Sequence, residues 1–142
     1  MTTPRFISSE DGLTVVEPAR DLTWTRDDVG DGQLTFAQAE AAIAKLNAEQ
    51  FAGFTDWRLP TVEELFLLAD RTRFDPAIDT DAFPTCKSSW YWTSTDDASE
   101  EKDEESGTSE FAWIVGFVSG HSNLVPRGYG NRVRAVRGAS RQ

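Results

Sequence analysis

Residues 56–65 read Asp-Trp-Arg-Leu-Pro-Thr-Val-Glu-Glu-Leu, and this stretch decides where an extended segment ends and a helix begins. Pro60 disfavours the helical conformation for the residue before it, so Leu59 is expected to be extended. Thr61 and Glu64 then have the spacing of a capping box, in which each side chain accepts a hydrogen bond from the other residue's backbone N–H. The stretch therefore predicts a helix that begins directly after Thr61.

Arg58 and Glu64 flank this chain reversal, and two interpretations of the pair are open. They form a ligand-binding or catalytic pair, or they hold the fold together. We favour the second interpretation, because Glu64 is explained as a helix cap and the guanidinium of Arg58 suits a carboxylate or backbone carbonyls while its stem packs on Trp57. The sequence therefore predicts structural roles for Trp57, Arg58 and Glu64.

Two short strands and a helix are expected before this stretch. Residues 13–16 and 22–25 combine β-branched and apolar side chains around a turn. Thr35 and Gln38 form a second capping box, followed by apolar residues at three- and four-residue spacing. The first part of the chain is thus expected to supply one hairpin and one amphipathic helix.

Strands are expected after the second helix. Residues 90–95 and 111–118 read as strands, and residues 131–137 read as a final strand with its arginines on the exposed face. Early helices followed by antiparallel strands favour an α+β fold. The length suits a single domain over residues 1–142.

The aromatic cluster Trp90-Tyr91-Trp92 lies in one of these strands. Alternation places the two tryptophans on one face and Tyr91 on the other. We interpret Trp92 as a structural core residue, while Trp90 is the better candidate for an exposed stacking platform.

Several motifs occur along the chain in the order of one known family. They are Gly12-Leu13-Thr14, Asp21-Leu22-Thr23-Trp24, Thr35-Phe36-x-x-Ala39, the 56–65 stretch, Tyr91-Trp92-Thr93-Ser94-Thr95, Ala112-Trp113-x-Val115-x-Phe117-x-x-Gly120 and Val133-Arg134-Ala135-Val136-Arg137-Gly138. As a set they resemble the Legionella collagen-like protein C-terminal domain family over residues 12–138. The resemblance implies a C-type-lectin-like fold, distantly similar to formylglycine-generating enzymes, with two helices packed on a twisted antiparallel sheet and long loops.

Charge is distributed unevenly along the chain, whose net charge is −10. Residues 96–110 hold eight acids and one base, a net charge of −7, where the family resemblance lapses. Residues 121–142 hold five arginines and no acid, a net charge of +5. The acidic total opposes direct binding of nucleic acid, because phosphates would be repelled.

The acidic insertion at residues 96–110 has two interpretations. It is a solvated loop, as charge runs mostly are, or it is a contact surface for a basic partner. In the second case the contact residues are Asp96, Asp97, Glu100, Glu101, Asp103, Glu104 and Glu105.

The polar, glycine-spaced segment 121–131 also has two interpretations. It is an ordinary connection, or it belongs to a recognition face, since binding residues often lie on loops carried by a rigid scaffold. The predicted contact residues here are His121, Asn123, Arg127, Tyr129, Asn131 and Arg132.

The chemistry of an enzyme or metal site is not visible. Cys86 is the single cysteine and His121 the single histidine, so an intramolecular disulfide and the His/Cys spacing of a zinc site are excluded. No phosphate-binding loop and no nucleophile motif occurs. The related formylglycine-generating enzymes use active-site cysteines, and Cys86 matches no such motif. We predict no catalytic residue, no metal and no cofactor.

The function that these observations favour is a non-enzymatic binding module for a macromolecular partner, preferably a protein with a basic surface. One alternative is a small acidic inhibitor of phage type, resembling anti-CRISPR proteins, that blocks a basic nucleic-acid-binding host protein. A second alternative, which the family resemblance implies, is adhesion to sulfated polysaccharide.

The location of the protein is predicted from what its sequence lacks. No apolar run approaches the roughly 20 residues of a membrane span. The first residues lack the apolar core of a signal peptide. The expectation is a cytoplasmic protein without a membrane partner, or an exported one if a leader was removed.

Overall fold

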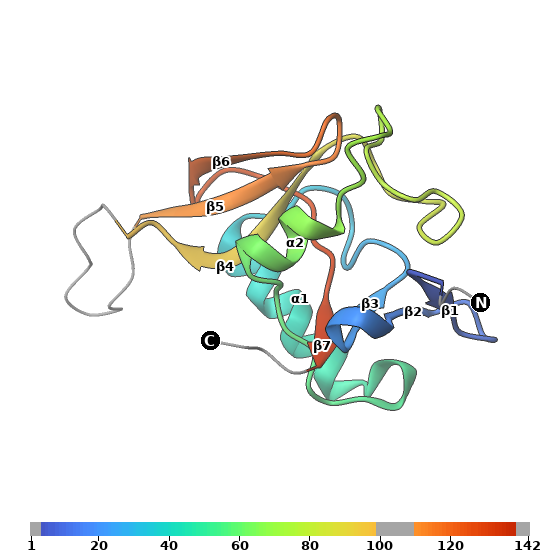
Figure 1. Cartoon of the computed structure of the whole chain (residues 1–142). Helices are drawn as coiled ribbons and strands as arrows, with labels where there is room; N and C mark the ends of the chain where they lie inside the picture. The colour runs from blue at the N-terminus through green and yellow to red at the C-terminus, as the bar shows by residue number, and fades with distance from the viewer. Residues whose placement is uncertain (1–3, 99–109, 139–142) are drawn as a thin grey trace.

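The computed structural model describes residues 4–98 and 110–138, and it confirms the α+β class with two helices and two antiparallel sheets (Figure 1). The first sheet contains, in spatial order, β1 (Ile7–Ser8), β2 (Thr14–Glu17), β3 (Leu22–Thr25) and β7 (Val136–Gly138). The second sheet contains β4 (Trp90–Asp96), β5 (Phe111–Gly116) and β6 (His121–Pro126). Helices and 3₁₀ turns join the strands, namely α1 (Phe36–Ala48), α2 (Val62–Leu68), η1 (Pro18–Arg20) and η2 (Phe51–Gly53).

Both predicted capping boxes are confirmed. The Thr35 hydroxyl accepts a hydrogen bond from the N–H of Gln38 (3.3 Å), and the Gln38 side chain accepts one from the N–H of Thr35 (2.9 Å). The same exchange between Thr61 and Glu64 has distances of 3.2 and 2.9 Å. These caps satisfy backbone donors that the first turn of each helix would otherwise leave free.

The structure has two sheets where a single sheet was predicted. The residues directly before β7 do not form part of that strand, and they connect the two sheets instead. Arg132 forms an isolated bridge with Tyr91 of β4, whereas β7 pairs with β3 in the other sheet. Residues 131–135 thus cross from one sheet to the other, and we call them the crossing segment. The prediction of one strand over residues 131–137 with exposed arginines is wrong, because β7 begins at Val136 and Arg134 is fully buried.

Strands β4 and β5 lie between two hydrophobic clusters, so both of their faces are buried. Tyr91 and Val115 belong to the cluster that includes the buried side of α2. Trp92 and Ile114 belong to the cluster that includes Phe36 and the buried side of α1. Because side chains alternate along a strand, the central hairpin contributes to both cores at once.

The first half of the predicted polar connection is a strand. β6 pairs with β5 in unbroken register from Gly116–His121 to Phe111–Pro126. Asn123 Oδ1 accepts the N–H of Leu124 at 2.8 Å, and Pro126 has no N–H to offer. This edge strand therefore presents few free donors to another chain, which opposes edge-to-edge association.

Candidate functional site

Arg58 and Glu64 form a two-pronged ion pair beside the start of α2. Arg58 Nη1 and Nη2 each lie 2.8 Å from one carboxylate oxygen of Glu64. Burial alone would raise the pKa of Glu64, but hydrogen bonds from Arg58 and the Thr61 N–H outweigh burial and lower that pKa. The geometry accounts for both residues as parts of the scaffold.

We expect Glu64→Gln to lower the free energy of unfolding by about 1–2 kcal/mol at neutral pH, because an amide cannot accept both guanidinium bonds. Since the folded-state pKa is lowered, this contribution is present above the unfolded-state pKa and is lost as pH falls through the folded-state value. Urea unfolding of both proteins from about pH 7 to about pH 3 should show the difference narrowing below about pH 4.5. A difference that does not change with pH would contradict this account.

A groove with a volume of about 660 Å³ lies between α1 and β4, and we call it the α1 groove. Its apolar lining is supplied by Phe36, Ile43, Trp57 and Leu59, and its polar lining includes Glu40, Arg58, Ser94, Asp96 and Arg127. The Arg127 guanidinium lies 4.0 Å from the centroid of the Phe36 ring and donates a hydrogen bond to Asp96 at 2.9 Å. The two regions predicted to bind a partner therefore meet at this groove.

Only the first two of the predicted contact residues in the acidic loop are among the described residues. Asp96 ends β4 and is paired with Arg127. Asp97 is only 6% exposed, and its N–H points to the carbonyl of Phe111 (3.4 Å) where β5 begins. This burial removes Asp97 from the predicted contact surface. The other predicted residues of this loop, Glu100, Glu101, Asp103, Glu104 and Glu105, lie outside the described residues.

Three residues of the predicted polar segment are exposed. His121 and Asn123 lie on β6, where the Ser119 hydroxyl is 3.1 Å from His121 Nδ1. Tyr129 is 60% exposed between two glycines, and its N–H donates to the carbonyl of Pro126. These side chains remain available to a partner.

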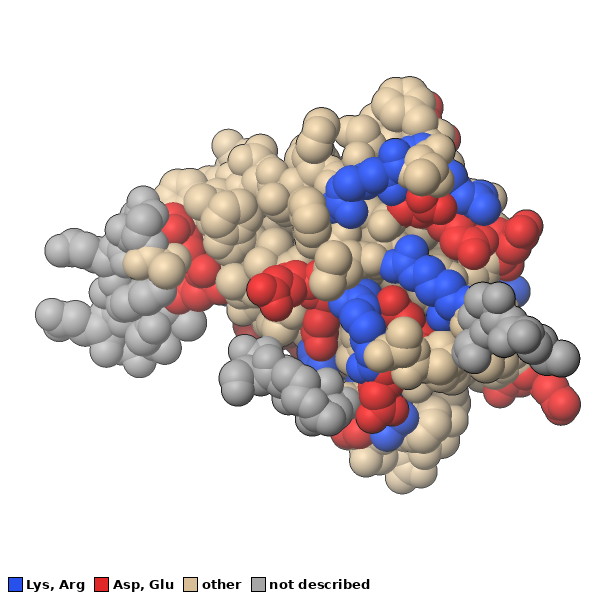
Figure 2. Space-filling model, in the orientation of Figure 1, with Lys and Arg blue, Asp and Glu red and all other residues tan. Residues whose placement is uncertain are grey.

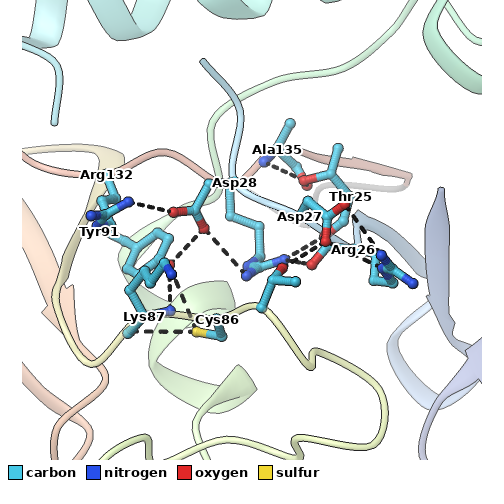
Figure 3. Close-up of polar contacts among 11 residues, drawn as sticks. Thr25, Arg26, Asp27, Asp28, Cys86, Lys87, Tyr91, Arg132 and Ala135 are labelled. Atoms are coloured by element: carbon cyan, nitrogen blue, oxygen red, sulfur yellow. Dashed lines mark hydrogen bonds and ion pairs between the residues drawn. The ribbon is translucent and has the colours of Figure 1, made fainter. Parts of the chain in front are cut away.

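Arg132, another residue of the segment, contacts Asp28 inside the molecule (Figure 3). Tyr91 Oη donates to Asp28 Oδ1 at 2.6 Å, and Arg132 Nη1 donates to Oδ2 at 3.1 Å. Arg134 Nη2 lies 3.6 Å from Oδ1. Arg132 thus links the loop that contains Asp28 to β4, where it bridges Tyr91. Its neighbour Asn131 is only 6% exposed. Burial removes Asn131 from the predicted contact surface, whereas Arg132 keeps a side chain that is 25% exposed while it pairs with Asp28.

Cys86 lies beside this cluster and is buried. Its Sγ is 3.8 Å from Tyr91 Oη, which also accepts the N–H of Lys87 at 3.1 Å. Burial raises the pKa of the Cys86 thiol, although the nearby Arg134 opposes the shift. Burial also raises the pKa of Tyr91. A protonated, buried thiol is a weak nucleophile. The cluster is therefore best explained as a structural contact that joins the loops of Asp28 and Lys87 to Tyr91 of β4.

The sequence did not single out Asp28 or Tyr91 as partners of the arginines. A signal was present, however: the segment 121–142 has five arginines and no acid. Buried charges must be paired, so any arginine of this segment that enters the core requires a carboxylate from elsewhere in the chain. Asp28, in the loop before α1, is that carboxylate for both Arg132 and Arg134.

Within residues 4–98 and 110–138, no three His, Cys, Asp or Glu side chains gather in a way that could hold a metal ion. Neither described helix has the length and apolar character that a transmembrane span requires. The model of one protein family, described as the Lcl C-terminal domain, matches residues 13–137 and confirms the predicted resemblance. No curated protein matches the chain.

Proposed function

Because the chain belongs to the Lcl C-terminal domain family, we propose that it is a non-enzymatic binding module that recognises a macromolecular partner. We favour a protein with a basic surface as this partner. The scaffold we infer is C-type-lectin-like, supported by two helices, two antiparallel sheets and long connections. Its exposed loops and grooves would bind the partner without catalysing a reaction on it.

One observation carries this proposal: each described arginine of the basic C-terminal segment faces a carboxylate. The ion pairs are Arg127–Asp96 (2.9 Å), Arg132–Asp28 (3.1 Å), Arg134–Asp28 (3.6 Å) and Arg137–Asp56 (2.6 Å). Figure 2 shows basic and acidic side chains side by side over the centre and right of the visible face. These arginines are therefore paired with carboxylates inside the molecule. The net charge of the chain is negative, and a negative surface complements a basic one.

The same ion pairs weigh against adhesion to sulfated polysaccharide. Sulfate groups require cations that are free to pair with them, and Arg134 is fully buried while the other three are already matched. We therefore place the polysaccharide alternative behind the protein partner.

Affinity capture from a bacterial lysate at about 50 mM and about 500 mM salt tests the proposed function. We expect a defined protein with a basic surface to be retained at low salt, and less of it when Glu100, Glu101, Asp103, Glu104 and Glu105 are replaced by Gln or Asn. Retention that is insensitive to salt and to these replacements would argue against a basic partner. Heparin binding that survives the replacements would favour adhesion.

Tyr129→Ala is expected to weaken binding of that captured protein about tenfold, because exposed tyrosines often anchor protein interfaces. The free energy of unfolding should stay within about 0.5 kcal/mol, since the ring is largely exposed. Titration calorimetry with the purified partner measures the change, and Tyr129→Phe serves as the matched control. Equal affinities for the wild-type and Ala proteins would remove Tyr129 from the contact surface.

A second candidate, the inhibitor of a nucleic-acid-binding protein, is favoured by the fixed start of the acidic loop. Asp96 ends β4 and pairs with Arg127, so the acidic run begins at the end of a strand. A run of carboxylates can compete with phosphates for a basic groove. Displacement of labelled DNA from the captured partner would support this candidate, and simultaneous binding of DNA and this protein would refute it.

A further inference from the structure

A second groove adjoins the α1 groove at the start of α2. It also has a volume of about 660 Å³ and is lined by η1, the start of β3 and the first turn of α2. Thr61 and Thr95 line both grooves, so the two lie next to each other on one part of the surface. Figure 2 shows acidic side chains gathered near the start of α2, with basic ones beside them.

The basic side chains in these grooves are matched, whereas several acidic ones are not. In the second groove Arg20 Nε and Nη2 each donate to Glu17 at 2.9 Å, and in the α1 groove both arginines are paired as described above. Three other lining carboxylates, those of Asp21, Glu40 and Glu63, are exposed and form no ion pair with another described residue. The unmatched charge at both grooves is therefore negative.

Both grooves also offer apolar surface between these carboxylates. Leu22 and Val62 line the second groove, and Phe36 and Trp57 line the α1 groove. A helix about 10–12 Å across would not enter two separate hollows. An extended chain advances about 3.3 Å per residue and points successive side chains to opposite sides, so it can cross the two threonines and use both.

We propose that the two grooves together bind an extended segment of a partner protein in which basic and apolar side chains alternate. Its lysine or arginine side chains pair with Asp21, Glu40 and Glu63, and its apolar side chains enter the grooves. The inference rests on the proposed function and adds to it the binding mode and the place. It uses Asp21, Glu40 and Glu63, which lie outside both the acidic loop and the polar segment.

The test uses a fluorescein-labelled peptide of about ten residues in which lysine and valine alternate, followed by fluorescence anisotropy. The triple variant Asp21→Asn, Glu40→Gln, Glu63→Gln removes the three unmatched charges. Asparagine is chosen at position 21 because the backbone there has a φ of 55°, which asparagine tolerates. We expect the triple variant to bind the peptide about tenfold more weakly than the wild-type protein.

A matched control separates the grooves from the overall charge. The variant Glu10→Gln, Asp31→Asn, Asp81→Asn loses the same charge at exposed positions that line neither groove, and its affinity should stay within about twofold of wild type. Ala19→Trp and Ser94→Trp fill one groove each and should each weaken binding, with circular dichroism confirming that both variants fold. Equal affinities of the two triple variants, or no binding of the peptide to the wild-type protein, would overturn the inference.

The same assay distinguishes failure of this inference from failure of the proposed function. If replacing the acidic-loop carboxylates abolishes peptide binding while the groove variant binds normally, the partner is basic but does not use the grooves. If a captured partner shows no salt dependence and the peptide does not bind, both proposals fail.

Discussion

Arg134→Met is expected to lower the free energy of unfolding by about 3–5 kcal/mol at neutral pH, because the replacement breaks a buried, paired charge. The guanidinium is fully buried and donates hydrogen bonds to the carbonyls of Thr25 (2.6 Å) and Arg26. It also lies 3.6 Å from Asp28 and 4.8 Å from the centroid of the Phe83 ring. Removing it takes this donor away from the carbonyls of Thr25 and Arg26, and among the described residues it leaves Asp28 with Tyr91 and Arg132 alone. Urea unfolding measures the loss.

Arg137→Met is the matched control for this prediction. Arg137 pairs with Asp56, whose side chain is 58% exposed, so its loss should cost less than about 1 kcal/mol. Asp28→Asn combined with Arg134→Met should destabilise less than the sum of the two single changes, because both single changes remove the same ion pair. Similar losses for the two arginine variants would show that Arg134 is not a buried anchor.

Trp92→Ala is expected to lower the free energy of unfolding by about 3–5 kcal/mol, the cost of a large cavity in a core. The ring is fully buried and meets Phe36 edge to face, with 5.4 Å between the ring centroids. Its Nε1 donates to the carbonyl of Leu34 at 2.7 Å, so the replacement also removes this hydrogen bond. Thermal and urea unfolding both report the change.

Trp90→Ala removes the same side chain two positions earlier in the same strand. Trp90 is 36% exposed and covers Gly116 on the neighbouring strand. Its loss should cost about 1 kcal/mol, because no enclosed cavity forms. If the two variants were equally unstable, the assignment of Trp92 to the second core would be wrong.

The helices were predictable because their start signals are local. A capping box needs only two side chains three residues apart, and both boxes form around Thr35 and Thr61. The central strand β4 was equally readable from its aromatic residues. In each case the physics that fixes the element acts within a few residues.

The crossing segment and β6 were not predictable in the same way. Arg134 looks like a surface residue until Asp28, more than a hundred positions earlier, is placed beside it. The first residues of β6 are polar, and Gly120 and Gly128 lie near its two ends. These residues form a strand because they pair with the apolar β5. For the candidate site, the prediction of Tyr129 as an exposed residue agrees with the structure, whereas the burial of Asn131 depends on that crossing segment.

The crossing segment has a consequence for how the protein is made. Its residues contact Leu34, Tyr91 and Thr25, which belong to parts of the chain that are synthesised earlier. Translation adds about 5–20 residues per second, so both helices and the central hairpin leave the ribosome before the residues that lock them together. We expect nascent chains released before residue 131 to remain protease-sensitive, with Asp28 lacking its two arginines. Native packing of the helices and the central hairpin is therefore completed only after residues 131–135 have been synthesised.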